Sequence, residues 1–162
     1  MELAEIKTTI KTTIKTTIKT TIKTMQIEMN RIDDAFHFEA LGSDKIAVHI
    51  DGAAAIGGSH KGARPMELIL MGLGGCSAID VLLILKKMKQ QVEDIKIIVE
   101  GDREDGATLA PFVGLRLRFI LRGPNLEQKK VEQAVKLSID KYCSVSVMLE
   151  KSASINWVVE LL

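Results

Sequence analysis

The sequence predicts an α+β protein with the element order βββ-α-ββ-α-β, in which a long central helix is buried against largely antiparallel sheets. Several short segments alternate apolar and polar residues, as half-buried strands do. Two longer segments, near residues 65–85 and 125–142, have the length and apolar content of packed helices. The chain of 162 residues is 46% hydrophobic and 27% charged, which is typical of one globular domain.

The first 24 residues stand apart from this pattern. Residues 6–24 read IKTTIKTTIKTTIKTTIKT, a perfect four-residue repeat. Its β-branched residues favour a strand over a helix, but such regular repetition is typical of a cloning artefact or a simple-repeat expansion. We interpret residues 1–24 as a low-complexity extension, tag-like or flexible, with a functional basic arm as the alternative. The folded domain is then expected at residues 25–162.

The folded part begins with three predicted strands, which form an antiparallel meander. Apolar and polar residues alternate in each, and Asp, Gly and Ser residues mark the turns between them. The predicted strands are residues 26–32, 36–40 and 45–50. A glycine-rich loop, residues 57–62, follows them.

A long helix is predicted to begin at Arg64–Pro65, because Pro suits the first helical position. Apolar residues continue almost without a gap to Leu85, so we expect the helix to be buried on most sides. Length alone would allow a membrane span. The charge of Asp80 near its centre, which costs about 2.5–3.5 kcal/mol in a membrane, and the soluble pattern of the other segments argue against one.

The C-terminal half is predicted to contain two strands, a helix and a last strand. In residues 113–122 the alternation is clean, and it places Val113, Leu115, Leu117, Phe119 and Leu121 on one face and Arg116, Arg118 and Arg122 on the other. The other two predicted strands are residues 95–100 and 155–161. Asn125 and Gln128 resemble a capping box that opens a helix to about Tyr142.

Charge and cysteine content exclude several classes of protein. The net charge of +1 gives no electrostatic reason to expect a nucleic-acid partner. Two cysteines do not make a disulfide scaffold. Residues 1–24 lack the apolar core of a secretory signal, so we expect a reducing cytoplasmic location, where a disulfide would be transient and chemical.

Cys76 lies among three glycines, Gly72, Gly74 and Gly75, each of which costs roughly 1 kcal/mol in a helix relative to Ala. Either another element approaches the helix closely, or the helix kinks and leaves Cys76 at a fresh helical start, where free N–H groups would favour a thiolate. Asp80 shares a face with Cys76. Its charge would disfavour a thiolate, so we expect it to bind an arginine or a backbone group instead.

No pattern of metal ligands or of a hydrolase is present in the sequence. The two cysteines are 67 positions apart, CxxC, HExxH and GxSxG motifs are absent, and His37, His49 and His60 are scattered along the chain. We therefore expect neither a Cys/His zinc site nor a hydrolytic site.

Two runs resemble the OsmC/Ohr family, most closely its OsmC-like, YhfA-type branch. The first is RPMELILMGLGGCSAIDV, which combines Pro-x-Glu, a glycine pair, Cys76 and Asp80. The second is YCSVSVML, which contains Cys143. The resemblance covers roughly residues 26–162 and includes the order of the elements.

The resemblance implies an intertwined homodimer with active sites at its interface, and a cysteine-based peroxidase activity against organic hydroperoxides or hydrogen peroxide. Cys76 would be the peroxidatic thiolate and Cys143 the resolving thiol, with an external dithiol as reductant and no cofactor. Family members assist the thiolate with a Glu and a strand Arg. Glu67, one residue later than in Ohr-type members, and Arg31 are the corresponding candidates here.

Two other functions remain open at the level of sequence. The chain could be a redox-sensing or small-ligand-binding dimer on the same fold, whose thiols oxidise without useful turnover. Alternatively, both cysteines are inert core residues of a structural protein.

Overall fold

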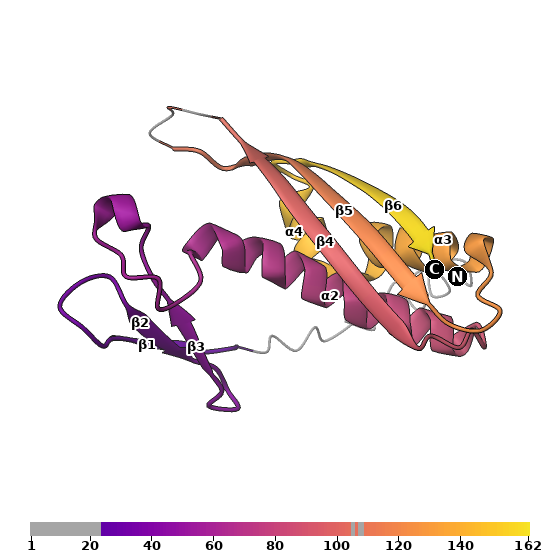
Figure 1. Cartoon of the computed structure of the whole chain (residues 1–162), viewed down its shortest axis with the longest axis horizontal. Coiled ribbons are helices and arrows are strands. Elements are labelled where there is room, and N and C mark those ends of the chain that lie inside the picture. The colour runs from indigo at the N-terminus through magenta and orange to yellow at the C-terminus, as the bar shows by residue number, and fades with distance from the viewer. Residues whose placement is uncertain (1–23, 105, 107–108) are drawn as a thin grey trace, which may run out of the picture.

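The computed structural model describes residues 24–104, 106 and 109–162, so the predicted extension, apart from Thr24, lies outside the described residues. The elements are β1 (Glu28–Arg31), β2 (Phe38–Leu41), β3 (Ala47–Ile50), η1 (Ala54–Ile56), α2 (Pro65–Lys87), β4 (Asp94–Arg103), β5 (Phe112–Arg122), α3 (Gln128–Leu137), η2 (Ser138–Tyr142), α4 (Ser144–Leu149) and β6 (Ser154–Leu161). This α+β order confirms the prediction, with additions around η1, η2 and α4 (Figure 1).

The second long helix differs from its prediction at both ends. It begins at Gln128 after the N-cap Glu127, while Asn125 has a left-handed φ of 57° and lies in the preceding turn. The predicted capping box at Asn125 is therefore wrong, because an N-cap residue needs an extended backbone. At its C-terminal end the helix widens into the π-turn η2, and this change of pitch leaves Tyr142 exposed.

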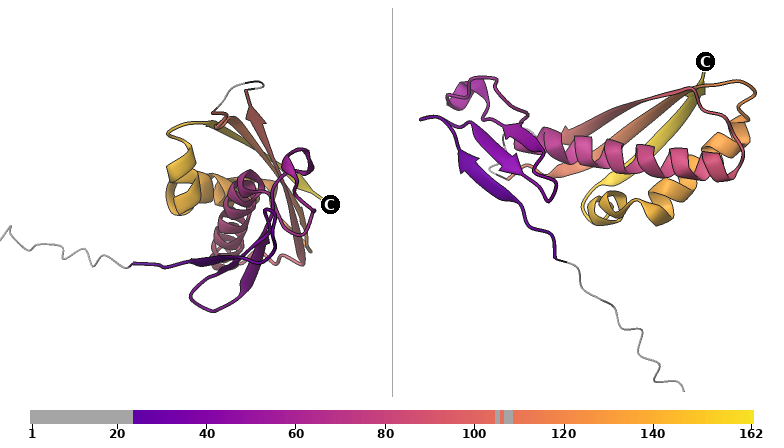
Figure 2. Two further views of the ribbon diagram at one scale, coloured as in Figure 1. Left: turned by 90° about the vertical axis from the view of Figure 1, so that its left-hand side faces the viewer. Right: turned by 90° about the horizontal axis from the view of Figure 1, so that it is seen from below.

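The first three strands form a separate antiparallel sheet in the order β1-β2-β3. This N-terminal sheet lies at the end of the molecule where α2 begins (Figures 1 and 2). Every residue of β1 is exposed, and in the whole sheet only Ala40 is buried. The sheet therefore has almost no core of its own within one chain.

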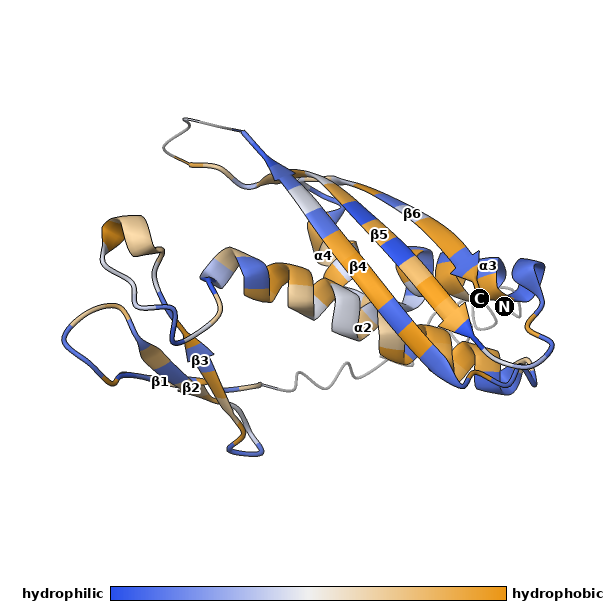
Figure 3. Cartoon of the chain, viewed as in Figure 1, coloured by the Kyte–Doolittle hydropathy of each residue, from blue (hydrophilic) through white to orange (hydrophobic). Residues whose placement is uncertain are grey.

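The C-terminal sheet has the order β4-β5-β6, and β4 and β5 pair antiparallel. β6 pairs parallel to β5, after a crossover through α3, η2 and α4. Apolar residues alternate with charged ones along most of β5, whereas β4 carries an uninterrupted apolar stretch at its centre (Figure 3). The central strand β5 buries the predicted inner face from Leu115 to Leu121 and exposes its arginines.

Val113 is an exception on β5, because it is 44% exposed whereas Phe112 is buried. The pairing register shifts where Asp102 opposes Gly114 and Arg103 opposes Phe112, so that Val113 is an extra residue on β5. Such a bulge reverses the alternation on its far side. The predicted inward position of Val113 is therefore wrong.

α2 packs against β4, α3, η2 and α4, but it buries only one face. The buried residues recur every fourth position: Leu73, Ser77, Val81 and Leu85. The helix is long and apolar enough to cross a membrane, yet only 28% of its most apolar window is buried. The expectation of burial on most sides is thus wrong for a single chain, which leaves Ile69, Met71, Ile79, Leu82 and Leu83 exposed.

The helix runs without interruption through its glycines, so Cys76 does not begin a new helical segment. The kink that the glycines allowed is absent from α2. Close approach explains Gly74, because a Cβ placed there would lie 3.0 Å from Cγ2 of Val99 on β4. Gly72 and Gly75 face open space in the single chain.

The glycine-rich loop is organised around Asp51, which is 1% exposed. Its carboxylate accepts hydrogen bonds from the backbone N–H groups of Gly52, Ser59 and Lys61, at 2.7, 2.9 and 3.0 Å. These hydrogen bonds lower the pKa of Asp51 to about 2, and the bond from the N–H of Lys61 has the largest effect. The loop therefore folds around a carboxylate of its own chain.

Candidate functional site

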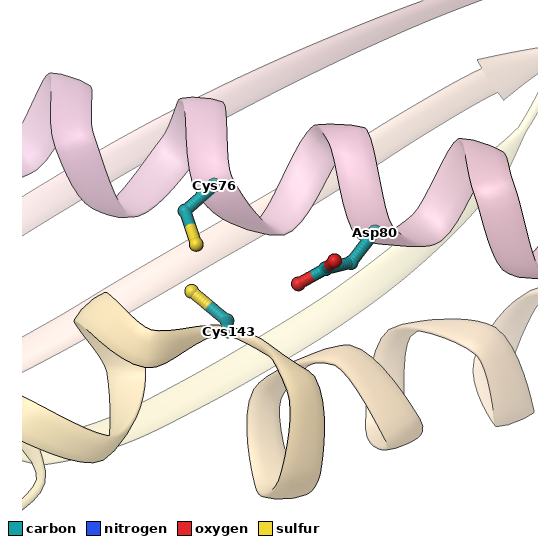
Figure 4. Close-up of side chains that lie close together, drawn as sticks. All are labelled: Cys76, Asp80 and Cys143. Atoms are coloured by element: carbon teal, nitrogen blue, oxygen red, sulfur yellow. The ribbon is translucent and has the colours of Figure 1, made fainter. Parts of the chain in front are cut away.

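The fold brings the two cysteines together between α2 and α4. Cys76 lies midway along α2, and Cys143 is the N-cap residue of α4. Their sulfur atoms point toward each other (Figure 4) and lie within 4.8 Å. Both thiols are free, Cys143 being fully buried and Cys76 half-buried. A disulfide between them would need only a modest approach of the two side chains.

Hydrogen bonds from two buried serines fix the segment that carries Cys143, and one of them joins it to α2. Ser138 donates its hydroxyl to the carbonyl of Ser77 on α2, at 3.3 Å, and Ser146 donates to the carbonyl of Ile139, at 2.9 Å. The N–H of Cys143 donates to the carbonyl of Ser138, at 2.8 Å, across the π-turn. π-turns are uncommon and often occur at functional sites. This one therefore indicates that the local backbone fixes Cys143 in its place beside α2.

The surroundings of the two thiols differ in burial, and burial acts on the pKa of Cys143. Burial raises the pKa of the Cys143 thiol, and the neighbouring Cys76 sulfur raises it further. The N–H of Ser146, 3.4 Å from Sγ of Cys143, acts in the opposite direction but does not reverse the shift. The Cys143 thiol therefore holds its proton more firmly than a free cysteine does.

Asp80 lies one turn after Cys76 on the same side of α2. A carboxylate oxygen of Asp80 lies within 4.8 Å of both sulfur atoms (Figure 4). Its Oδ2 atom is buried and has no hydrogen-bond partner among the described residues. The expectation that Asp80 binds an arginine or a backbone group is therefore not met at this oxygen, and the carboxylate is directed toward the cysteine pair instead (Figure 4).

The two predicted helper residues are not beside Cys76 within one chain. Glu67 is in the first turn of α2, nine positions before Cys76, or about 13 Å along the helix axis. Its carboxylate accepts the N–H of Arg64 and pairs with the guanidinium of Arg64, which together lower the pKa of Glu67. Arg31 is exposed at the end of β1, a strand outside the group that packs on α2.

The fold brings together two histidines that the sequence did not predict to be in contact. Nε2 of His37 lies 3.0 Å from Nδ1 of His49, and His37 is 8% exposed. Nδ1 of His37 lies 3.9 Å from Oδ2 of Asp33. No signal in the sequence pointed to this contact, because it depends on the hairpin register, in which Glu39 opposes His49. The pair belongs to the N-terminal sheet rather than to the cysteine site.

Within the described ranges, the two sulfurs and the Asp80 oxygen form the group whose donor types could suit a metal ion. Sequence spacing alone did not reveal this group, because folding joins positions 67 residues apart. Three donors are fewer than the four of a structural zinc site. The absence of a metal site stays a prediction.

Comparison with known proteins gives concordant results. Residues 58–158 match the family described as OsmC-like protein. The chain is 45% identical over 96 residues to Protein YhfA of Escherichia coli K12, which covers 59% of this chain and 71% of that protein. A crystal structure of a protein from Aquifex aeolicus VF5 has a TM-score of 0.72 at 34% identity and covers 87% of this chain and 99% of that one.

At lower identity, the fold is shared with a structure from Legionella pneumophila that is described as an organic hydroperoxide resistance protein OsmC. The TM-score is 0.65 at 16% identity, with coverage of 86% of this chain and 98% of that one. The family match spans more than half of the chain and includes the segments of both cysteines. Sequence, fold and cysteine geometry therefore agree that the chain belongs to the OsmC family.

Proposed function

We propose that this chain is a soluble cytoplasmic thiol peroxidase that reduces organic hydroperoxides or hydrogen peroxide. The observation that carries the proposal is the pair of facing sulfurs of Cys76 and Cys143, within 4.8 Å. Two low-identity neighbours, from Legionella pneumophila and Vibrio cholerae, are described as organic hydroperoxide resistance proteins, which supports a redox role for the fold.

The chemistry follows from the different surroundings of the thiols. The half-buried Cys76, as the thiolate, attacks the peroxide O–O bond, becomes a sulfenic acid and releases an alcohol or water. The buried Cys143 then attacks the Cys76 sulfur, and a disulfide and water form. An external dithiol reduces the disulfide by exchange. The raised pKa of the Cys143 thiol keeps it from competing with Cys76 for the peroxide, and its proton must leave when it attacks in the second step.

The proposal includes a homodimer with active sites at the interface. Two features support it: the exposed apolar side of α2, with Met71, Ile79 and Leu83, and an apolar groove of about 520 Å³ between α2 and β4. A second copy would cover both. The proposed helper roles of Arg31 and Glu67 also require the second copy, since neither residue is beside Cys76 in its own chain.

The test is hydroperoxide consumption by the purified protein with a dithiol reductant. We expect Cys76→Ser to abolish turnover. Cys143→Ser, the matched variant, should still consume one equivalent of cumene hydroperoxide and accumulate a sulfenic acid that dimedone traps. Turnover by Cys76→Ser at the wild-type rate would overturn the mechanism.

The same thiol titration separates the alternative functions. Loss of both thiols after one equivalent of hydroperoxide, without steady-state turnover, would indicate a redox sensor. No loss of thiols would indicate two inert cysteines.

A further inference from the structure

We propose that Asp80 transfers the proton in the second step of the reaction, from the thiol of Cys143 to the hydroxide that leaves the sulfenic acid of Cys76. This inference rests on the proposed peroxidase function and adds a catalytic residue to it. Asp80 has no place in the two cysteine steps of the proposed function, in which its charge would only oppose a thiolate.

The geometry places one unpartnered carboxylate beside both reacting sulfurs. A carboxylate oxygen of Asp80 and the two Sγ atoms lie within 4.8 Å of one another, and Figure 4 shows the carboxylate directed toward the pair. The Oδ2 atom has no hydrogen-bond partner among the described residues, although it is buried. A buried oxygen without a partner is costly, which indicates that the position serves the chemistry of the pair.

The second step needs a group of this kind. Disulfide formation converts a sulfenic acid and a thiol into a disulfide and water: the S–S bond forms, the S–O bond breaks, and the thiol proton ends on the departing oxygen. Cys143 is 0% exposed, so bulk water does not reach its proton. The N–H of Ser146, which contacts Cys143, is a donor and cannot accept that proton. Asp80 can accept it and then return it to the hydroxide, with no net change.

The same charge has the opposite effect on the first step. A carboxylate beside Cys76 disfavours the thiolate that attacks the peroxide. Neutral Asn at position 80 should therefore leave the first step as fast or faster while it slows the second. A merely structural change at this position would not produce effects of opposite sign.

The experiment measures the two steps separately in a single turnover of full-length, reduced protein. Cumene hydroperoxide consumption reports the first step, and disulfide formation, followed by acid quench and mass spectrometry, reports the second. In Asp80→Asn we expect hydroperoxide consumption at or above the wild-type rate. We expect disulfide formation to be slower by roughly 10²-fold, the range of general acid–base catalysis, with sulfenic acid accumulating for dimedone.

Asp140→Asn is the matched control, because Asp140 lies in η2 near the site but pairs with Lys136 at 2.6 Å. It should match wild type in both steps. Asp80→Ser provides the same test if the Asn variant does not fold.

The outcomes distinguish this inference from the proposed function. If the Asp80 variants consume hydroperoxide and form the disulfide at the wild-type rate, the proton-transfer role is wrong and the peroxidase stands. If the wild-type protein consumes no hydroperoxide, the proposed function is wrong and the role of Asp80 falls with it.

Discussion

The two sheets of this chain differ in how much apolar surface they bury within the chain. The C-terminal sheet buries one face of β5 under the helices, with Leu115, Phe119 and Leu121 at 0% exposure. The N-terminal sheet buries Ala40 alone and exposes Met29 and Val48 at 52% and 44%. Burial of apolar area is the main favourable term in folding, so the C-terminal part has a core of its own and the N-terminal sheet does not. The comparison teaches that the N-terminal sheet needs a surface outside its own three strands, which the proposed dimer would supply.

The largest expected effect comes from the core of the C-terminal sheet. Phe119→Ala should lower the free energy of unfolding by about 3–5 kcal/mol, because it leaves a cavity among fully buried side chains. Urea unfolding monitored by circular dichroism measures this loss. Phe36→Ala, at a side chain 43% exposed near the N-terminal sheet, is the control and should cost clearly less. Equal losses would remove the distinction between the two parts.

The next largest effect is expected at the proposed dimer interface, which would cover the apolar surface that one chain leaves exposed. Ile79→Glu places a charge on the exposed apolar side of α2, where Ile79 is 62% exposed. If that side is a dimer interface, the charge would be desolvated there and should weaken the dimer by roughly 10²-fold. Sedimentation velocity over a range of concentrations measures the dissociation.

The control is Val158→Glu on β6, which is 58% exposed on the C-terminal sheet and outside the proposed interface. It should leave assembly unchanged. In the dissociated Ile79→Glu protein, amide exchange should accelerate in β1–β3 and much less in β5. A monomeric wild-type protein with a protected N-terminal sheet would contradict the comparison.

A smaller and local effect is expected at Asp51, which organises the loop between the N-terminal sheet and α2. Its pKa is about 2 in the folded chain, below the ordinary value of 3.8. The bonds to the amides of Ser59 and Lys61 therefore stabilise the loop fully above about pH 4 and are lost as the pH falls through about 2. Amide chemical shifts of Ser59 and Lys61 should titrate with that midpoint.

Asp51→Asn should increase amide exchange at Ser59 and Lys61 by roughly tenfold, because an amide is a weaker acceptor than a carboxylate. The urea midpoint of the C-terminal core should stay unchanged. A titration midpoint near the ordinary value of Asp would show that these bonds do not form in solution.

The smallest effect is expected from the charged outer face of the C-terminal sheet. Arg116 on β5 pairs across the strands with Asp102 and with Glu100, and the hydrogen bond and charge of Arg116 lower the pKa of Asp102. All three side chains are about half exposed or more, and exposed ion pairs contribute little to stability. Arg116→Gln should leave the urea midpoint within experimental error. A large shift would show that the outer face also carries the stability of the sheet.

The sequence by itself determined the element order and the family, and it singled out both cysteines as candidate site residues. Alternation, helical spacing and local motifs are properties of neighbouring residues, which is why a sequence can show them. It could not supply the bulge at Val113 or the π-turn before Cys143, since each is settled by packing against a distant element. Nor could it predict the pairing of His37 with His49.

The exposed side of α2 and the position of Asp80 were likewise decided only by the tertiary structure. An apolar helix gives no sign of which side its own chain leaves uncovered. A local motif could show that Asp80 shares a face with Cys76, but not that its carboxylate would lie unpartnered beside Cys143, 63 positions further along the chain. That contact exists because the crossover through α3 and η2 returns the chain to α2, and long-range packing of this kind is not encoded in any short stretch of sequence.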